Sequence, residues 1–237
     1  MCKKTTSRFE MSESNPVCNP IVLGTKVDRD AGGNIVNKPQ YKQIVSSLMY
    51  LTSTRPNIMF VTNLISRYMS RPTKFHLQLA KRILRYLKGT TEYDIFYKEG
   101  TSKGGLLAYT DTITQQPIVT LSTTEAEFVA ATACTCQAIW MMRILKELNH
   151  EDTECIQINC DNSSTIKLSK NPIIHGRSKH IDVRYHFLRD LTNEGVIALI
   201  HCGSTYQVAD IMTKPVKIEA FQKQRASMEI CTMSEII

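Results

Sequence analysis

The fold of this chain is decided by two apolar stretches that each end in an aspartate: LLAYTD, residues 106–111, and CIQINCD, residues 155–161. Both have the length and the apolar content of a buried β-strand. Asp111 and Asp161 therefore lie at predicted strand ends. In α/β folds, chemistry gathers where strands end and helices start, so these two aspartates are the first candidates for a functional site.

Predicted helices alternate with predicted strands through the C-terminal half. The sequence STTE at 122–125 matches a capping box and opens a long helix that continues to about Leu148. Alternation of this kind predicts an α/β sheet with parallel strand pairs. The other predicted elements are strands at 94–97, 105–110, 118–121, 155–160 and 196–200, a short helix after Asn162, a helix at 180–193, and a final helix beginning near Gln207.

The N-terminal part is predicted to be irregular over residues 1–40 and helical beyond them. Helices are expected at 41–53, 57–69 and 74–88. The sequence Arg-Pro interrupts the chain after each of the first two helices, because the residue before proline avoids helical backbone angles. The result is a small helical region before the α/β part.

One face of the predicted helix at 74–88 is basic, and its residues are Lys74, Lys81, Arg85 and Lys88. A basic stripe without acidic residues can follow a phosphate backbone. The simpler alternative is a solvated helix surface, which usually mixes in glutamates. Residues 1–100 hold 16 basic and 7 acidic side chains, a net charge of +9, whereas residues 101–237 hold 13 and 15, a net of −2. This asymmetry favours a nucleic-acid-binding surface in the basic N-terminal part and a cation-binding site in the acidic C-terminal part.

Four carboxylates form the candidate site: Asp111, Glu127, Asp161 and Asp210. Glu127 lies in the first turns of the long predicted helix, and Asp210 lies at the start of the final one. Four carboxylates gathered in one place cannot all ionise cheaply unless a cation neutralises them. Hard oxygen ligands suit Mg²⁺, with Mn²⁺ as a second possibility. Two such ions are a known device for cutting phosphodiesters.

Each carboxylate also has a plain structural alternative. Asp161 and Asp210 fit the N-cap position of a helix, and Asp111 fits a turn. Glu127 lies on the flank of an apolar helix face, where a surface glutamate is equally expected. Glu125 points roughly 200° away from Glu127 and cannot share a metal centre with it. Periodicity alone therefore gives only weak support for a metal site.

Composition narrows the class of protein. Hydrophobic residues make up 42% of the 237 residues, as in ordinary globular proteins. The sequence has no continuous run of 18 apolar residues, so no membrane span is expected. The N-terminus does not resemble a signal peptide. Eight cysteines without regular spacing do not form a disulfide scaffold. We expect reduced thiols and an intracellular protein, in cytoplasm or nucleus, that is not secreted.

Two regions resemble parts of copia-type retrotransposon Pol polyproteins. Residues 41–90 resemble the end of the reverse transcriptase, through YKQIVSSLMYLT at 41–52, TRPNI at 54–58 and AKRILRYLKGT at 80–90. Residues 104–215 resemble the ribonuclease H domain that follows it. The motifs there are LSTTEAEF at 121–128, CDN at 160–162, KHIDVRYHF at 179–187 and ADIMTK at 209–214.

The resemblance implies a ribonuclease H-like mixed sheet with flanking helices. It also implies that Asp111, Glu127, Asp161 and Asp210 hold two Mg²⁺ ions and hydrolyse RNA paired with DNA. In the family a histidine near the last aspartate assists proton movement. His201 lies near that place in the sequence, although a solvent-exposed histidine at a strand end is the favoured interpretation.

The chain departs from the family after Asp111. A pair of strands follows the first aspartate in the family, but here only fifteen residues lie between Asp111 and Glu127. Loss of two strands would expose a sheet edge and loosen Asp111, and metal chemistry tolerates little misplacement. We therefore expect a truncated, internally deleted protein with impaired activity, or an inactive protein that binds nucleic acid.

The expected organisation has four parts. It comprises an irregular segment at 1–40, a helical region at 41–92 like the reverse transcriptase thumb or connection, a ribonuclease H-like domain at 93–215, and a tail at 216–237.

Overall fold

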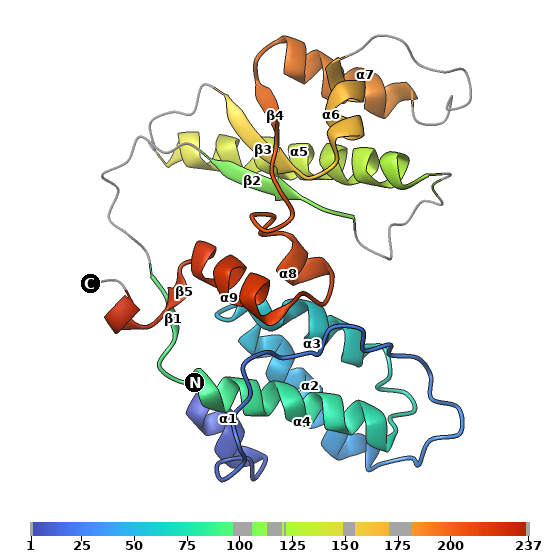
Figure 1. The fold of residues 1–237 in the computed structure, drawn as a ribbon, viewed down its shortest axis with the longest axis vertical. Helices are drawn as coiled ribbons and strands as arrows, with labels where there is room; N and C mark the ends of the chain where they lie inside the picture. Colours follow the sequence, from blue (N-terminus) through green and yellow to red (C-terminus); the bar gives the residue numbers. More distant parts are fainter. Residues whose placement is uncertain are drawn as a thin grey trace. The chain divides into compact units, whose positions relative to one another are not determined.

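The computed structural model describes residues 2–96, 106–112, 120, 122–148, 155–170 and 182–235. They belong to two compact units (Figure 1). Unit 1 comprises Met1–Lys98 and Asp210–Ile237, and unit 2 comprises Glu99–Ala209. The boundaries predicted from the sequence, at 93 and 215, differ from these. The reason is that the C-terminal segment packs and pairs with the N-terminal part inside unit 1, as described below.

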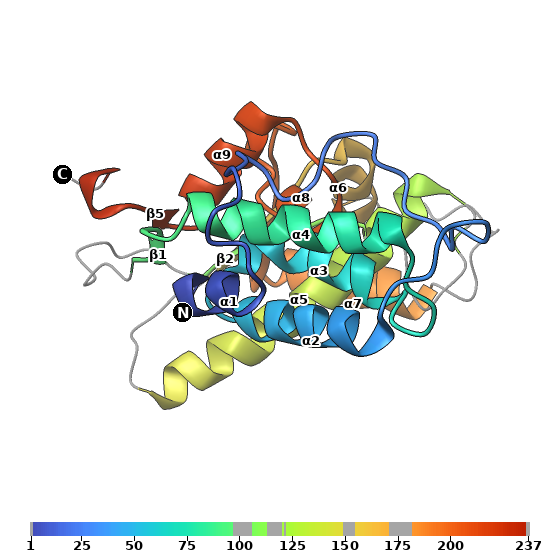
Figure 2. The same cartoon turned by 90° about the horizontal axis from the view of Figure 1, so that it is seen from below.

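Unit 1 is built mainly from helices. They are α1 (Cys2–Arg8), α2 (Lys38–Leu51), η1 (Pro56–Ile58), α3 (Met59–Ser66), α4 (Lys74–Gly89), α8 (Asp210–Thr213), α9 (Ile218–Ser227) and η2 (Met233–Glu235). Helices α2, α3 and α4 lie side by side (Figures 1 and 2). Asn37 starts α2 by accepting a hydrogen bond from the backbone N–H of Gln40 at 2.9 Å, which satisfies one of the free donors of the first turn.

The core of unit 1 is formed by apolar side chains of its helices. Tyr41, Leu48, Ile83 and Leu87 are fully buried. The Tyr41 hydroxyl donates to the carbonyl of Ile65 at 2.8 Å and ties α2 to α3. A buried tyrosine needs such a partner, because an unpaired hydroxyl in the interior is costly.

Helix α9 lies within the predicted C-terminal tail at 216–237. Phe221 of α9 is buried and meets the ring of Tyr86 edge-on, with ring centroids 5.6 Å apart. Aromatic pairs favour this geometry. Helix α1 likewise lies inside the segment predicted to be irregular at 1–40. Local sequence signals for both helices are weak, and packing against the core supplies what those signals lack.

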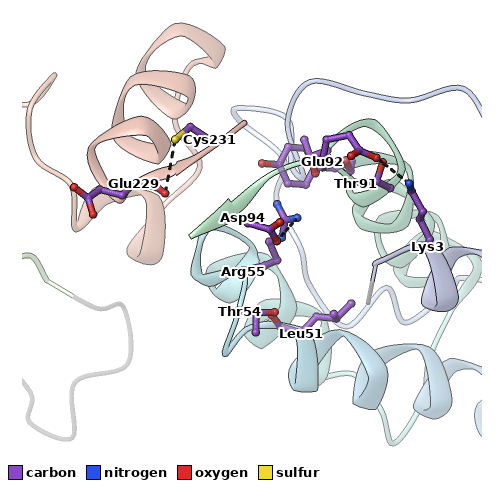
Figure 3. Close-up of polar contacts among 11 residues, drawn as sticks. Lys3, Leu51, Thr54, Arg55, Thr91, Glu92, Asp94, Glu229 and Cys231 are labelled. Carbon is purple, nitrogen blue, oxygen red and sulfur yellow. Dashed lines mark hydrogen bonds and ion pairs between the residues drawn. The ribbon is translucent and has the colours of Figure 1, made fainter. Parts of the chain in front are cut away.

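Two short strands join the two chain segments of unit 1. Strand β1 (Asp94–Ile95) pairs antiparallel with β5 (Ile230–Cys231). Figure 3 shows the side chains of Arg55 and Asp94 facing each other, with a nitrogen–oxygen distance of 3.9 Å. The Arg55 side chain is almost fully buried while that of Asp94 is exposed. The predicted strand at 94–97 is thus reduced to two residues in the part of the chain that the structure describes.

The second predicted helix, 57–69, is shorter in the structure. It begins as the 3-10 turn η1 and continues as α3, which ends at Ser66. Beyond that point the backbone N–H of Tyr68 bonds to the carbonyl of Ile65, a spacing of three residues. Such tight turns are common where an α-helix ends.

Unit 2 contains a three-stranded sheet among the described residues, in the order β2-β3-β4. Its elements are β2 (Leu107–Thr110), α5 (Thr123–Glu147), β3 (Ile156–Cys160), α6 (Ser163–Lys170), α7 (Asp182–Asn193) and β4 (Ile197–His201). Both strand pairs are parallel, with Thr110 opposite Cys160 and Cys160 opposite His201. The predicted mixed α/β fold with parallel pairs is confirmed. The predicted strand at 118–121 and the region of the missing strand pair lie outside the described residues, apart from Thr120.

The core of unit 2 lies between the sheet and its helices. Ile156, Ile158 and Cys160 are buried and alternate with less buried residues along β3. Ile156 and Ile158 belong to one core cluster with Phe128 of α5 and Leu188 of α7. Alternation with a period of two directs these residues to one face of the sheet. This packing holds the start of α5 against the carboxyl end of β3.

Helix α5 is long and apolar enough to cross a membrane by length and composition. It has 25 residues, with a mean hydropathy of 1.4 in its most apolar window. This is weak evidence, because core helices of soluble proteins pass the same test. In the described part of unit 2, α5 contacts β2 and β3.

Candidate metal centre

The carboxyl ends of the three parallel strands lie at one edge of the unit 2 sheet. Strand β2 ends at Thr110 and is followed by Asp111, and β3 ends at Cys160 and is followed by Asp161. Thr110 and Cys160 are register partners, so the two aspartates leave adjacent strands side by side. This is the edge where open α/β sheets bind ligands. His201 ends β4 at the same edge and is exposed.

Glu127 approaches this edge from the start of α5. Ser122 caps the helix by accepting a hydrogen bond from the backbone N–H of Glu125 at 3.1 Å. The next residue, Phe128, is fully buried in the core and fixes the rotation of the helix. Glu127 is consequently only 8% exposed.

Three side chains converge at this point: Glu127, Cys160 and Asp161. One ligand atom from each lies within 4.8 Å of the others. The structure thus brings two of the predicted carboxylates together and adds the thiol of Cys160, which is not among the predicted site residues. Burial raises the pKa of that thiol to about 12.

The electrostatics of the cluster are unfavourable without a cation. Burial, and after it the nearby charges of Asp111 and Asp161, raise the pKa of Glu127 to about 7, while hydrogen bonds from Thr112 oppose the rise. Its Oε2 atom is buried and has no hydrogen-bond partner among the described residues. Like charges and desolvation both penalise the ionised form, so a bound cation would relieve both.

Asp161 does not cap the helix that follows it. Asn162 does so, because its Oδ1 accepts hydrogen bonds from the backbone N–H groups of Ser164 at 3.0 Å and Thr165 at 3.1 Å. This resolves one alternative that the sequence left open. The Asp161 carboxylate remains at the cluster.

Gln207 supports the neighbouring strand end. Its side chain is fully buried and its Nε2 donates to the carbonyl of Thr110 at 2.8 Å. That carbonyl immediately precedes Asp111, whose Oδ1 accepts from the backbone N–H of Thr112 at 2.8 Å. Gln207 is not among the predicted site residues, because a lone glutamine carries no periodic signal.

Asp210, the fourth predicted carboxylate, begins α8 and belongs to unit 1. The structure therefore describes it separately from the three carboxylates of unit 2. The Asp210 carboxylate is buried, and its Oδ1 lies 2.9 Å from the Nζ atom of Lys214, one helical turn later. This ion pair was also not predicted.

The basic face predicted on α4 is partly occupied by the N-terminal segment of unit 1. Arg85 donates from Nε to the carbonyl of Asn15 at 2.6 Å, and Lys88 donates from Nζ to the carbonyl of Ser14 at 2.8 Å. Lys74 and Lys81 are exposed. Two of the four predicted contacts to nucleic acid therefore also hold the protein's own backbone.

Comparisons with known proteins identify the family. The chain is 34% identical to the retrovirus-related Pol polyprotein from transposon RE1 of Arabidopsis thaliana, and 32% identical to that from transposon RE2 of the same plant, in each case over 91% of the chain. It is 32% identical to the Pol polyprotein from transposon TNT 1-94 of Nicotiana tabacum, over 93% of the chain.

These alignments cover only 16%, 17% and 19% of the three relatives, so the chain spans less than a fifth of their length. No protein-family profile matches the chain, and no solved structure matches it. Because the similarity extends over almost the whole chain, the protein belongs to the copia-type retrovirus-related Pol polyproteins.

Proposed function

We propose that unit 2 is a ribonuclease H-like domain that hydrolyses the RNA strand of RNA–DNA hybrids in a metal-dependent reaction. The observation that carries the proposal is the convergence of Glu127 and Asp161 at the carboxyl end of β3, with a buried Glu127 oxygen that has no hydrogen-bond partner among the described residues. Asp111 acts on Glu127 through its charge. All three carboxylates match the motifs that the resemblance assigns to catalysis.

The donor set fits a divalent cation. Carboxylate oxygens are the ligands that Mg²⁺ prefers, and Mn²⁺ accepts the same ligands. When bound there, such ions would supply an activated water and stabilise the leaving 3′ oxygen. The residues of the chain hold the ligands in place: hydrogen bonds from Thr112 orient Glu127, and Gln207 fixes the carbonyl before Asp111. Asp210 enters this proposal through its sequence motif alone.

The proposed substrate contacts come from the basic half of the chain. Lys74 and Lys81 project from α4 as exposed cations, and residues 1–100 carry a net charge of +9. Exposed lysines bind phosphates without sequence preference. They would therefore serve a hybrid substrate of any sequence.

The test is cleavage of a labelled RNA–DNA hybrid by the purified protein, with Mg²⁺, with Mn²⁺ and with a chelator. We expect slow, metal-dependent cleavage that Asp161→Asn abolishes. Asp190→Asn is the matched control, because Asp190 is an exposed aspartate on α7 of the same unit. Equal cleavage by the Asp161→Asn variant would refute the site.

An inactive nucleic-acid-binding protein is the competing outcome. It is favoured by the shortened segment after Asp111 and by the positive charge of residues 1–100. A folded protein that binds the hybrid with a strong salt dependence, yet cleaves it with neither metal ion, would establish binding and exclude hydrolysis.

A further inference from the structure

We infer that Glu127, Cys160 and Asp161 form a site for a thiophilic divalent cation, with Zn²⁺ as the physiological candidate, and that this cation competes with Mg²⁺ for the same carboxylates. The binding site stands on the geometry of unit 2. Only its consequence, inhibition of hydrolysis, rests on the proposed function.

The first observation is the position of Cys160. It is the last residue of β3 and is fully buried. The period of two along a strand puts it on the same sheet face as Ile156 and Ile158, which pack with Phe128 of α5. Glu127 enters from that helix, and Asp161 is the next residue along the chain. The ligand atoms of the three side chains lie within 4.8 Å of one another. Tetrahedral zinc ligands lie about 3.5 Å apart, a contraction within the reach of side-chain rotation.

The second observation is independent of this grouping. Glu127 is more than nine-tenths buried, and its Oε2 atom has no hydrogen-bond partner among the described residues. A buried polar atom of this kind calls for a partner such as a bound ion. Among the described residues, the group of possible metal ligands that includes the Glu127 side chain is completed by Cys160 and Asp161.

The chemistry of the thiol decides which cation is preferred. Mg²⁺ takes oxygen ligands and gains nothing from sulfur, whereas Zn²⁺ and Cd²⁺ bind thiolate strongly. Binding replaces the S–H bond of Cys160 by a sulfur–metal bond, and the proton leaves to solvent without any change of oxidation state. The weak contact from Cys160 Sγ to the carbonyl of Asn162, at 3.7 Å, is given up in the process.

Competition follows from shared ligands. Two of the three proposed zinc ligands, Glu127 and Asp161, are also proposed magnesium ligands. An ion held by the thiol therefore occupies the carboxylates and leaves Mg²⁺ without them. A large excess of Mg²⁺ should in turn weaken the apparent affinity for the thiophilic ion.

The test uses Cd²⁺ as a spectroscopic probe for the full chain, reduced with a phosphine that does not bind the metal. We expect an ultraviolet thiolate-to-cadmium charge-transfer band in the wild type, and a loss of that component in Cys160→Ser. Cys134→Ser is the matched control, because Cys134 is a partly buried thiol on α5 of the same unit. Millimolar Mg²⁺ should shift the wild-type titration to higher Cd²⁺ concentrations.

Glu127→Gln provides a second variant that keeps the thiol, and it should weaken Cd²⁺ binding at least about tenfold through loss of an anionic ligand. A band of unchanged amplitude in folded Cys160→Ser would overturn the inference, as would a Cd²⁺ titration unaffected by Glu127→Gln. The two proposals fail separately: a Cys160-dependent band without hybrid cleavage removes the hydrolase alone, and cleavage without such a band removes the thiophilic site alone.

Discussion

Replacing Glu127 by glutamine should stabilise the metal-free protein at alkaline pH. Burial and two neighbouring aspartates raise the pKa of Glu127 from 4.5 to about 7. Because the folded state holds this proton more tightly than the unfolded state, the contribution to stability is fully present below pH 4.5. It is lost as the pH rises through 7.

The magnitude follows from the displacement of the pKa. Ionising Glu127 in the folded state costs about 3 kcal/mol at pH 8 and under about 1 kcal/mol at pH 5. Glutamine resembles the neutral acid in shape and can still accept the hydrogen bonds from Thr112. The Glu127→Gln variant should therefore be more stable than the wild type by about 3 kcal/mol at pH 8, with little difference at pH 5.

The assay is urea unfolding at the two pH values in the presence of a chelator. The chain has one tryptophan, Trp140, which lies on α5, so its fluorescence reports unfolding of unit 2. Glu147→Gln is the control, because Glu147 is an exposed glutamate at the far end of the same helix. Its free energy of unfolding should change little at either pH.

Magnesium should reduce the stability advantage of Glu127→Gln at pH 8. A cation that neutralises the cluster stabilises the wild type by about 1.4 kcal/mol at a tenfold excess over its dissociation constant, and it should stabilise Glu127→Gln less. The reasoning is refuted if Glu127→Gln is no more stable than the wild type at pH 8 without metal, or if its advantage is equal at both pH values.

Three further variants, one of them a double variant, test other parts of the structure. Gln207→Ala removes a buried donor from the strand end before Asp111, and urea unfolding should show a loss of about 1–2 kcal/mol; an unchanged midpoint would contradict the hydrogen bond. Phe221→Ala should destabilise unit 1 by about 3–5 kcal/mol, measured by thermal unfolding, whereas the exposed Ile218 should tolerate alanine. Lys74→Glu combined with Lys81→Glu should weaken hybrid binding and reduce the slope of log affinity against log salt by about 2; an unaltered slope would exclude this surface.

The positions of most elements were predictable from local patterns. The apolar runs at 106–110 and 155–160, and the capping sequence at 122–125, correspond to β2, β3 and the start of α5. Strand periodicity and capping depend on neighbours within a few residues. Helix α9 was missed, because what holds it is the burial of Phe221 in a core formed by residues far away in the sequence.

The candidate site was only partly predictable for the same reason. The motifs marked Asp111, Glu127, Asp161 and Asp210 one by one, but left open whether Asp161 capped a helix. The hydrogen bonds of Asn162 answered that question. The sequence predicts Cys160 only as one of eight reduced thiols, because its nearness to Glu127 depends on the packing of α5 against β3.

The sequence by itself determined the family, the order of helices and strands, and the carboxylates at strand ends and helix starts, because these are written in short-range patterns and motifs. Only the tertiary structure decided that a thiol joins Glu127 and Asp161, that Gln207 supports the neighbouring strand end, and that α9 completes the core of unit 1. These features arise from contacts between segments far apart in the chain, where packing and burial, rather than local propensity, fix the partner of each side chain.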